Sequence, residues 1–243
     1  MSIKVKALSK TYGTQKAVDQ ITFEASPGRI LGFLGPNGAG KSTTMKMLTC
    51  YLPQTAGEAT VCGFNIASQS LEVRKRIGYL PESNPLYQEM YVKEFLYFVA
   101  HIYHISNIKE RVNEVILATG LVKEQHKKIG ELSKGYKQRV GLAQAIIHNP
   151  EVLILDEPTS GLDPNQLIEI RKLIKELGKT KTVILSTHIM QEVEAICDDV
   201  IIINKGKIVA NDSLENLLVK HNEKSLEPIF VKLTKELKVE SEM

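Results

Sequence analysis

The segment GPNGAGKS, residues 35–42, sets glycines, a lysine and a hydroxyl in the spacing G-x-x-x-x-G-K-[ST]. Glycines let backbone amides turn toward a bound anion, the lysine adds positive charge, and a serine hydroxyl suits Mg²⁺. An apolar strand pattern precedes the segment and a helical pattern follows it, which favours a nucleoside triphosphate site over a chance glycine turn. We expect Lys41 to reach the β and γ phosphate oxygens and Ser42 to bind magnesium. The predicted phosphate loop comprises Gly35, Pro36, Asn37, Gly38, Ala39, Gly40, Lys41 and Ser42.

Two carboxylates, Asp156 and Glu157, follow the apolar run VLIL. In a parallel sheet the ends of neighbouring strands converge at one edge, where we expect the phosphate loop to lie. Asp156 is expected to hold magnesium through water, because a hard cation prefers oxygen ligands. Glu157 points elsewhere and can orient or deprotonate the attacking water as a general base. An acidic strand end is ordinarily a solvated turn, but the apolar run and the phosphate loop favour the catalytic interpretation.

The histidines give a weaker signal. His188 ends the next predicted strand, LSTH, where it can hydrogen-bond a γ-phosphate or the water beside it. His101 and His104 stand three residues apart on an apolar helix pattern, at a spacing that could grip a metal. With no other ligand near them, a core or interface role is favoured for this pair.

A second anion cradle is predicted at ELSKGYKQRVGLAQAI, residues 131–146. Ser133 can cap a helix that begins after it, and Gly135 lets a ligand approach the backbone. The amides of the first helical turn and the positive end of the helix dipole complete the cradle. The chain therefore carries two anion sites, although one phosphate loop is enough to hold one triphosphate.

Strand and helix patterns alternate around these residues, which predicts an α/β fold. Strands are expected at IKVKAL, AVDQITFEA, RILGFLG, EVLILDEP and KTVILSTH. The last two are almost continuously apolar, as is typical of parallel strands covered on both faces. Helices are expected over residues 41–52 and 164–178, and a hairpin is expected to turn at Lys205-Gly206.

Residues 85–150 change to helical periodicity, with apolar residues three and four apart, and are expected to form a lobe inserted in the core domain. We expect one domain over residues 1–220 and a short, charged and amphipathic tail over residues 221–243.

The composition of the chain indicates which partners and which cellular compartment to expect. The chain has 243 residues, 31 basic and 28 acidic, with a net charge of +3 and no basic run, which disfavours a nucleic-acid partner. Three cysteines at no disulfide or metal-ligand spacing favour a reducing compartment. No apolar run approaches the length of about 18 residues that a membrane span needs. We therefore expect a cytoplasmic protein that can dock on an embedded one.

Read in order, GPNGAGKS, LSKGYKQR, LILDEP, SGLD and STH make this chain resemble the nucleotide-binding subunits of ABC transporters. The resemblance covers residues 2–235. A phosphate loop alone is shared by many NTPases, whereas LSKGYKQR before the acidic strand end is specific to this family. The resemblance implies an ATPase with ATP and Mg²⁺ as cofactors. It also implies a P-loop NTPase core with a mainly parallel sheet, an N-terminal antiparallel β-subdomain and an inserted helical lobe.

The resemblance also explains the second cradle. In that family two subunits pair head to tail, so Ser133 and Gly135 would serve the γ-phosphate bound by a partner subunit. ATP would then close the dimer, because its γ-phosphate supplies contacts that ADP lacks. Tyr12 matches the aromatic residue that stacks on adenine, Asp163 in SGLD matches the loop that signals between the two sites, and Thr43 follows Ser42 as is usual.

The chain departs from the family pattern at three positions. The usual signature is LSGGQ, and here Lys134 replaces the first glycine and Tyr136 the glutamine. Glu82, in IGYLPES, takes the place of a glutamine that touches magnesium and water. A carboxylate can also ligate magnesium, but it adds negative charge near Glu157.

The chain looks most like the drug, lipid and polysaccharide exporter branch of the family. The features that carry this likeness are the motif YLPE, the short lobe and the tail LEPIFVKLT. Within that branch, the closest likeness is to an ATP-binding subunit associated with gliding motility. The leading hypothesis is an exporter ATPase, peripheral on the cytoplasmic face of the membrane. It would pair with a copy of itself or a paralogue and push on a separate permease through a groove near residues 82–91. Aromatic candidates for the groove or the lobe core are Tyr87, Tyr91, Phe95 and Tyr97.

Two other classes stay open. A soluble ATPase of the same fold, such as that of iron-sulfur cluster assembly, needs no permease. The translation or chromosome-associated ATPases of the superfamily are a third class. They carry two cassettes or long coiled coils, and this chain has one cassette without sustained heptads.

Overall fold

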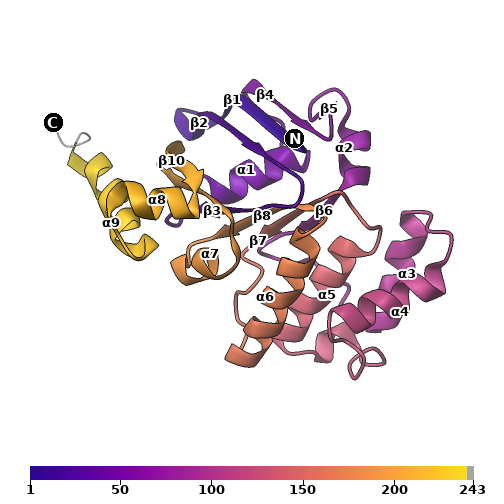
Figure 1. Ribbon diagram of the computed structural model, residues 1–243. Coiled ribbons are helices and arrows are strands. Elements are labelled where there is room, and N and C mark those ends of the chain that lie inside the picture. The colour runs from indigo at the N-terminus through magenta and orange to yellow at the C-terminus, as the bar shows by residue number, and fades with distance from the viewer. Residues whose placement is uncertain (240–243) are drawn as a thin grey trace.

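The N-terminal residues form a small antiparallel sheet in the order β2-β1-β4-β5. A computed structural model describes residues 1–239, with side chains through residue 235. In Figure 1 this sheet lies at one end of the molecule, above helix α1. The expected antiparallel subdomain is confirmed. Its strands are β1 (Ile3–Tyr12), β2 (Gln15–Ala25), β4 (Ala56–Val61) and β5 (Phe64–Asn65).

The second sheet has the order β10-β9-β3-β8-β7-β6, and only β10 runs antiparallel to its neighbour among the described strands. Alternate residues of β7 face two separate cores: Leu153 packs with one cluster and Ile154 with the other. Burial on both faces explains the continuous apolar runs of the sequence. The strands are β3 (Ile30–Leu34), β6 (Ile77–Leu80), β7 (Val152–Asp156), β8 (Thr182–Thr187), β9 (Asp199–Asn204) and β10 (Lys207–Ser213).

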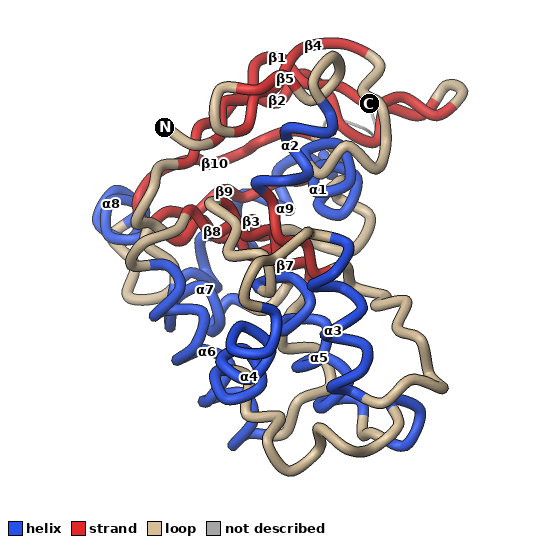
Figure 2. The backbone as a smooth tube through the Cα atoms, turned by 90° about the vertical axis from the view of Figure 1, so that its right-hand side faces the viewer, coloured by secondary structure: helices blue, strands red, loops and turns tan. Residues whose placement is uncertain are grey.

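Helix α1 covers one face of the second sheet, and α5, α6 and α7 pack with the other core. The segment expected to be helical forms α3, α4, η1 and α5. Helices α3 and α4 lie to one side of α5 in Figure 1, while α5 itself packs against β6 of the second sheet. Figure 2 shows the same helices from another side. The helices are α1 (Lys41–Leu48), α2 (Ser70–Arg76), α3 (Val92–Ile102), α4 (Ile108–Ala118), η1 (Ile129–Glu131), α5 (Lys134–Ile146), α6 (Pro164–Gly178), α7 (Met190–Ile196), α8 (Leu214–His221) and α9 (Leu226–Val239).

Several predicted boundaries are confirmed. Helix α6 spans Pro164–Gly178, with Asp163 as its N-cap and proline in its first turn. The hairpin turns at Lys205-Gly206, between β9 and β10. Helix α5 begins directly after Ser133, whose side chain accepts a hydrogen bond from the Tyr136 amide.

Other boundaries differ. The helix expected over residues 41–52 ends at Leu48, because Cys50 takes a left-handed φ of 56°. Part of the expected tail is packed: Leu226 and Ile229 of α9 are buried in the core. Residues 240–243 of that tail lie outside the described residues. Within residues 1–239, no helix has the length and apolar character needed to cross a bilayer.

Candidate functional site

The phosphate loop joins the carboxyl end of β3 to the start of α1. Gly40, the N-cap of α1, has a φ of 108°, and a Cβ there would collide with the Ala17 carbonyl. A Cβ at Gly35 would collide with the Ile203 carbonyl. The glycines are therefore required by close backbone packing as well as by the turn of the loop.

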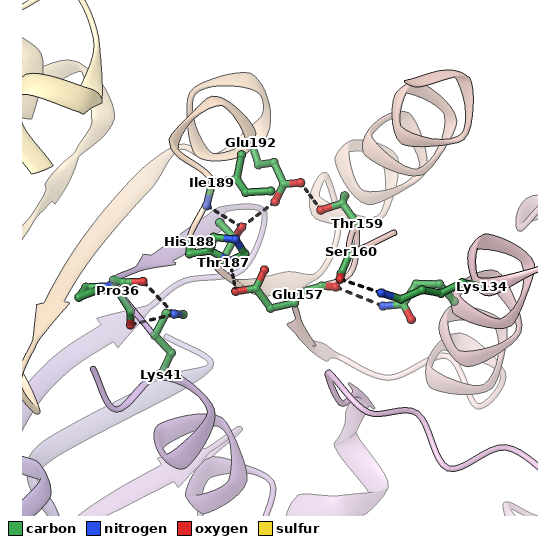
Figure 3. A network of polar contacts seen from close by, with 12 residues as sticks. Pro36, Lys41, Lys134, Glu157, Thr159, Ser160, Thr187, His188, Ile189 and Glu192 are labelled. Atoms are coloured by element: carbon green, nitrogen blue, oxygen red, sulfur yellow. Dashed lines mark hydrogen bonds and ion pairs between the residues drawn. The ribbon is translucent and has the colours of Figure 1, made fainter. Parts of the chain in front are cut away.

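The buried Lys41 side chain lies back over this loop. Its Nζ donates to the carbonyl oxygens of Gly35 at 2.8 Å and of Pro36 at 3.2 Å (Figure 3). Burial lowers the pKa of Lys41, while the negative charges of Glu157, Asp156 and Glu82 act in the opposite direction. A nearby phosphate would add further negative charge to hold this ammonium.

A cavity of about 540 Å³ opens beside the loop. It brings together residues that lie far apart in the sequence, as predicted from the strand ends. The predicted residues that line it are Asn37, Gly38, Gly40, Lys41, Ser42, Thr43, Glu82, Glu157 and His188. This volume and this polar lining suit a charged ligand such as a nucleotide.

Glu157 lines the cavity beside His188. Its Oε1 lies 2.9 Å from Nδ1 of His188, as Figure 3 shows. Its φ of 52° is uncommon for a glutamate and turns the chain sharply after β7. The Glu157 amide donates to the Ser186 carbonyl at 2.9 Å, and Nε2 of Gln138 donates to the Glu157 carbonyl at 3.2 Å. The backbone amide and carbonyl of Glu157 are thus both held by hydrogen bonds.

Burial raises the pKa of Glu157, and the neighbouring charge of Glu192 acts in the same direction. The hydrogen bond and charge of His188, and the charge of Lys41, oppose this rise. A carboxylate with a raised pKa that faces a cavity can accept a proton from water more readily than an ordinary surface glutamate.

A second cavity, of about 600 Å³, borders the first on the side of the lobe. All three predicted magnesium ligands, Ser42, Glu82 and Asp156, line it. Oδ1 of Asp156 is buried and has no hydrogen-bond partner. Because a buried carboxylate oxygen is costly to leave unpaired, this atom suits a cation or its bound water.

Three further predicted residues lie outside the first cavity. Ser133 and Asp163 are exposed, and each caps the helix that follows it: the Ser133 hydroxyl accepts from the Tyr136 amide at 3.4 Å, and Asp163 accepts from the Gln166 amide at 2.9 Å. Gly135 is buried, and a Cβ there would collide with the Gln166 side chain. The structure therefore does not bring the second anion cradle to the phosphate loop of its own chain.

Tyr12 is 48% exposed at the end of β1 and does not line either cavity. The Lys10 ammonium lies 5.3 Å from the centre of its ring. The hairpin that begins at Tyr12 nevertheless reaches the cavity through the following residues. The stacking of the Tyr12 ring on adenine stays a prediction.

Several lining residues were not predicted from the sequence: Gln15, Lys16, Ala17, Ser160, Lys205 and Gly206. The Gly206 amide donates to the Ala39 carbonyl at 2.9 Å, which ties the β9–β10 turn to the phosphate loop. The sequence predicted the β9–β10 turn but not its position at the phosphate loop. That position depends on the pairing of β9 with β3, which lie far apart in the sequence.

A phosphate loop at the end of a parallel strand, with Glu157 and His188 at the same cavity, defines a phosphate-loop ATPase. The chain belongs to the ABC transporter family, whose model matches residues 18–160. It is an ATP-binding subunit of that family, and ATP hydrolysis is its activity.

Named relatives agree with this family. The chain is 41% identical over 227 residues to the bacitracin transport ATP-binding protein BcrA of Bacillus licheniformis, a match that covers 93% of this chain and 74% of BcrA. It is 36% identical over 228 residues to the Nod factor export ATP-binding protein I of a Rhizobium species, covering 91% and 74%.

Solved structures agree as well. An ATP binding subunit of an ABC transporter superposes with a TM-score of 0.88 at 29% identity, covering 96% of this chain and 99% of that one. The dimeric structure of the bacterial ABC transporter cassette MJ0796 gives a TM-score of 0.81 at 25% identity, covering 87% and 98%.

Proposed function

We propose that this chain is the ATPase of an exporter, and that two cassettes closing on ATP drive a separate membrane permease. One observation carries this proposal. Lys41, Glu157 and His188 meet at one cavity, while Ser133 at the start of α5 lies outside it. A cassette divided in this way is complete only when a second cassette supplies its own signature helix.

In this proposal Lys41 and the loop amides hold the phosphates of ATP. Ser42 and Asp156 hold Mg²⁺, with Glu82 as a third oxygen ligand. Within residues 1–239, no group of three or more His, Cys, Asp or Glu side chains could hold a metal alone. Phosphate oxygens and water would therefore complete the coordination, and the ion would neutralise phosphate charge.

Glu157 orients the attacking water and accepts its proton. Nδ1 of His188 lies 2.9 Å from Oε1 of Glu157, and the ring of His188 is placed to hydrogen-bond the γ-phosphate or the water. The bond between the two side chains holds the carboxylate in one rotamer before nucleotide binds. Tyr12 stacks on the adenine.

Ser133 and Gly135 act on ATP bound to the partner subunit. The Ser133 side chain and the first amides of α5 present hydrogen-bond groups to solvent at the positive end of a 13-residue helix. Asp163 begins α6 beside this helix and carries the signal between the two sites. The dimer of MJ0796 supports the pairing, because its cassette has the same fold.

The permease docks at the second cavity in this proposal. Its walls combine basic Lys46 and Arg74 with the aromatic rings of Tyr51, Tyr79 and Tyr103. Tyr87 and Tyr91 are exposed and follow residues 81–85, which line this cavity, whereas Phe95 is buried in the lobe core. The second cavity therefore offers apolar surface and two basic side chains to a membrane-embedded partner on the cytoplasmic face, beside the Glu82 and Asp156 proposed to hold Mg²⁺.

Export is supported by the relatives, one of which is named for export of Nod factor and another for bacitracin transport. The likeness to a gliding motility-associated subunit stays a prediction, because neither relative is named for motility. Nucleic acid is not part of the proposal.

The permease can be tested by recovering Glu157→Gln protein, tagged and loaded with ATP, from its native membranes in mild detergent. Mass spectrometry is expected to find a polytopic membrane protein. Arg74→Glu in the same background should recover much less of it, whereas Lys172→Glu, an exposed charge reversal on α6, should not. Recovery of soluble proteins alone would favour the assembly ATPase and leave the nucleotide site standing.

A further inference from the structure

A carboxylate with no place in the mechanism above lies behind the cavity. Glu192, on α7, is 0% exposed. Its Oε2 accepts a hydrogen bond from the Thr187 hydroxyl at 2.7 Å, and its Oε1 accepts one from the Thr159 hydroxyl (Figure 3). The two donors come from different strand ends, so this one side chain joins two loops.

The first loop carries His188. Thr187 directly precedes it, and the Thr187 hydroxyl also accepts a hydrogen bond from the Ile189 amide at 3.1 Å. The residues on both sides of His188 are therefore tied to Glu192, directly or through one hydroxyl. A shift of that carboxylate would move the backbone that carries the imidazole.

The second loop follows Glu157. The Ser160 amide donates to the Glu157 carbonyl at 3.2 Å, and the Leu162 amide donates to the Thr159 carbonyl at 3.2 Å. Thr159 thus anchors a tight turn that carries Ser160, which lines the cavity, and leads to Asp163 at the start of α6. Its hydroxyl fixes this turn to Glu192.

The chemistry of the side chain fits this use better than a role in stability. Burying a carboxylate is costly, and two neutral hydroxyls offset only part of that cost. A leucine would fill the same space but would leave the buried hydroxyls of Thr159 and Thr187 without this acceptor. A carboxylate has two oxygens, and each can accept a hydrogen bond from a separate hydroxyl.

We propose that Glu192 is a positioning residue for ATP hydrolysis, which holds the loop of His188 against the turn of Ser160 and Asp163. The inference rests on the proposed roles of Glu157, His188 and Asp163. As a consequence, a movement of His188 on contact with the γ-phosphate would also move the turn of Ser160 and Asp163, which is proposed to face the partner cassette.

The test is steady-state ATPase kinetics of the full chain. Glu192→Ala is expected to lower kcat by about tenfold or more, while KM for ATP stays within about twofold of wild type, because misplacing a catalytic group affects turnover more than substrate binding. Because a partial loss of folded protein would also lower the apparent kcat at an unchanged KM, turnover is calculated per mole of protein that binds ATP.

The threonines allow a test without changing Glu192. Thr187→Val and Thr159→Val remove the hydroxyl and keep the shape, and both are expected to lower kcat. Thr187→Ser and Thr159→Ser keep the hydroxyl and are expected to restore most of it. Combining Thr187→Val with Glu192→Ala should cost no more than Glu192→Ala alone, because both changes break one network.

Two controls separate the possible failures. Glu194→Ala removes a carboxylate from the same helix that accepts from the Leu226 amide instead, and it should leave kcat near the wild-type value. Glu157→Gln reports on the proposed site itself. Wild-type kcat in Glu192→Ala, or serine variants as slow as the valine variants, would overturn the inference if Glu157→Gln is inactive. Normal turnover in Glu157→Gln would instead refute the proposed site.

Discussion

Single residues at the cavity owe their properties to burial. The same desolvation lowers the pKa of Lys41 and raises that of Glu157, and the charge of each partly offsets the shift of the other. Asp156 keeps one oxygen without a protein partner. Lys41 at the first cavity therefore suits a phosphate, and Asp156 at the second cavity suits a cation.

Glu157→Gln tests the general base. It is expected to keep ATP binding and to lower kcat by roughly 100-fold or more, because the amide cannot accept a proton from water. Nucleotide titration and single-turnover assays measure the two effects. Lys41→Ala is the contrasting variant and should lose nucleotide binding. Normal turnover in Glu157→Gln would move the general base elsewhere, with Glu82 as the first candidate.

His148 is expected to make the stability of the protein depend on pH. Its ring stacks on Tyr103 with centroids 3.9 Å apart, and burial lowers its pKa to about 4, with the charges of Arg111 and Lys181 acting in the same direction. The unfolded chain therefore binds more protons than the folded chain between about pH 4 and the ordinary histidine pKa of 6.5, and stability falls as pH drops through this window.

The expected loss between about pH 7 and about pH 5 is about 2 kcal/mol of unfolding free energy. Urea unfolding at both pH values measures it. His148→Gln should remove most of this pH dependence, and His126→Gln, at an exposed position, should not. An unchanged pH dependence in His148→Gln would contradict the assignment.

At the scale of elements, local rules predicted some boundaries and missed others. Asp163 and Pro164 mark the start of α6 by cap chemistry alone, and Ser133 does the same for α5. The segment from β4 to β6 gave no clear prediction, because its strands are short and β4 is largely exposed. Glu192 was missed for a different reason: its partners come from two distant strand ends.

Helix α5 carries the signature residues and depends on α4 at its other end. Nε of Arg111 donates to the Ile147 carbonyl at 2.7 Å, and Nη2 donates to the Ile146 carbonyl at 2.5 Å. Arg111→Met is expected to cost about 1–3 kcal/mol, because a charged cap at a helix C-terminus is lost. Chemical denaturation measures it. Lys109→Met, at an exposed position of α4, should change the free energy of unfolding little. Equal stability of the two variants would refute the capping role.

At the scale of the whole molecule, the sequence could predict an α/β core, a β-subdomain and a helical lobe, because motif order and periodicity mark each of them. The contacts that close the cavity could not be predicted: Lys205 and Gly206 reach it only through the pairing of β9 with β3. The division at residue 220 stays a prediction, and the burial of Leu226 shows that the chain beyond it packs on the core.

Ser133→Arg tests whether the second cradle acts on a partner. The variant is expected to lower turnover by about 100-fold, because it removes hydrogen-bond groups from the γ-phosphate and fills the interface. ATP binding to the isolated monomer should be unchanged, since Ser133 lies outside the cavity of its own chain. Fluorescent nucleotide titration at low protein concentration measures that binding. A weakened monomer affinity would show that the cradle acts within one chain.

The most direct measurement is the mass of Glu157→Gln in solution with ATP and with ADP, by size-exclusion chromatography with light scattering. We predict a dimer with ATP and a monomer with ADP, because only ATP brings the γ-phosphate that both cradles share. The dimer should be lost when Ser133→Arg is added. A monomer at saturating ATP would contradict the proposal that two cassettes close on shared nucleotide.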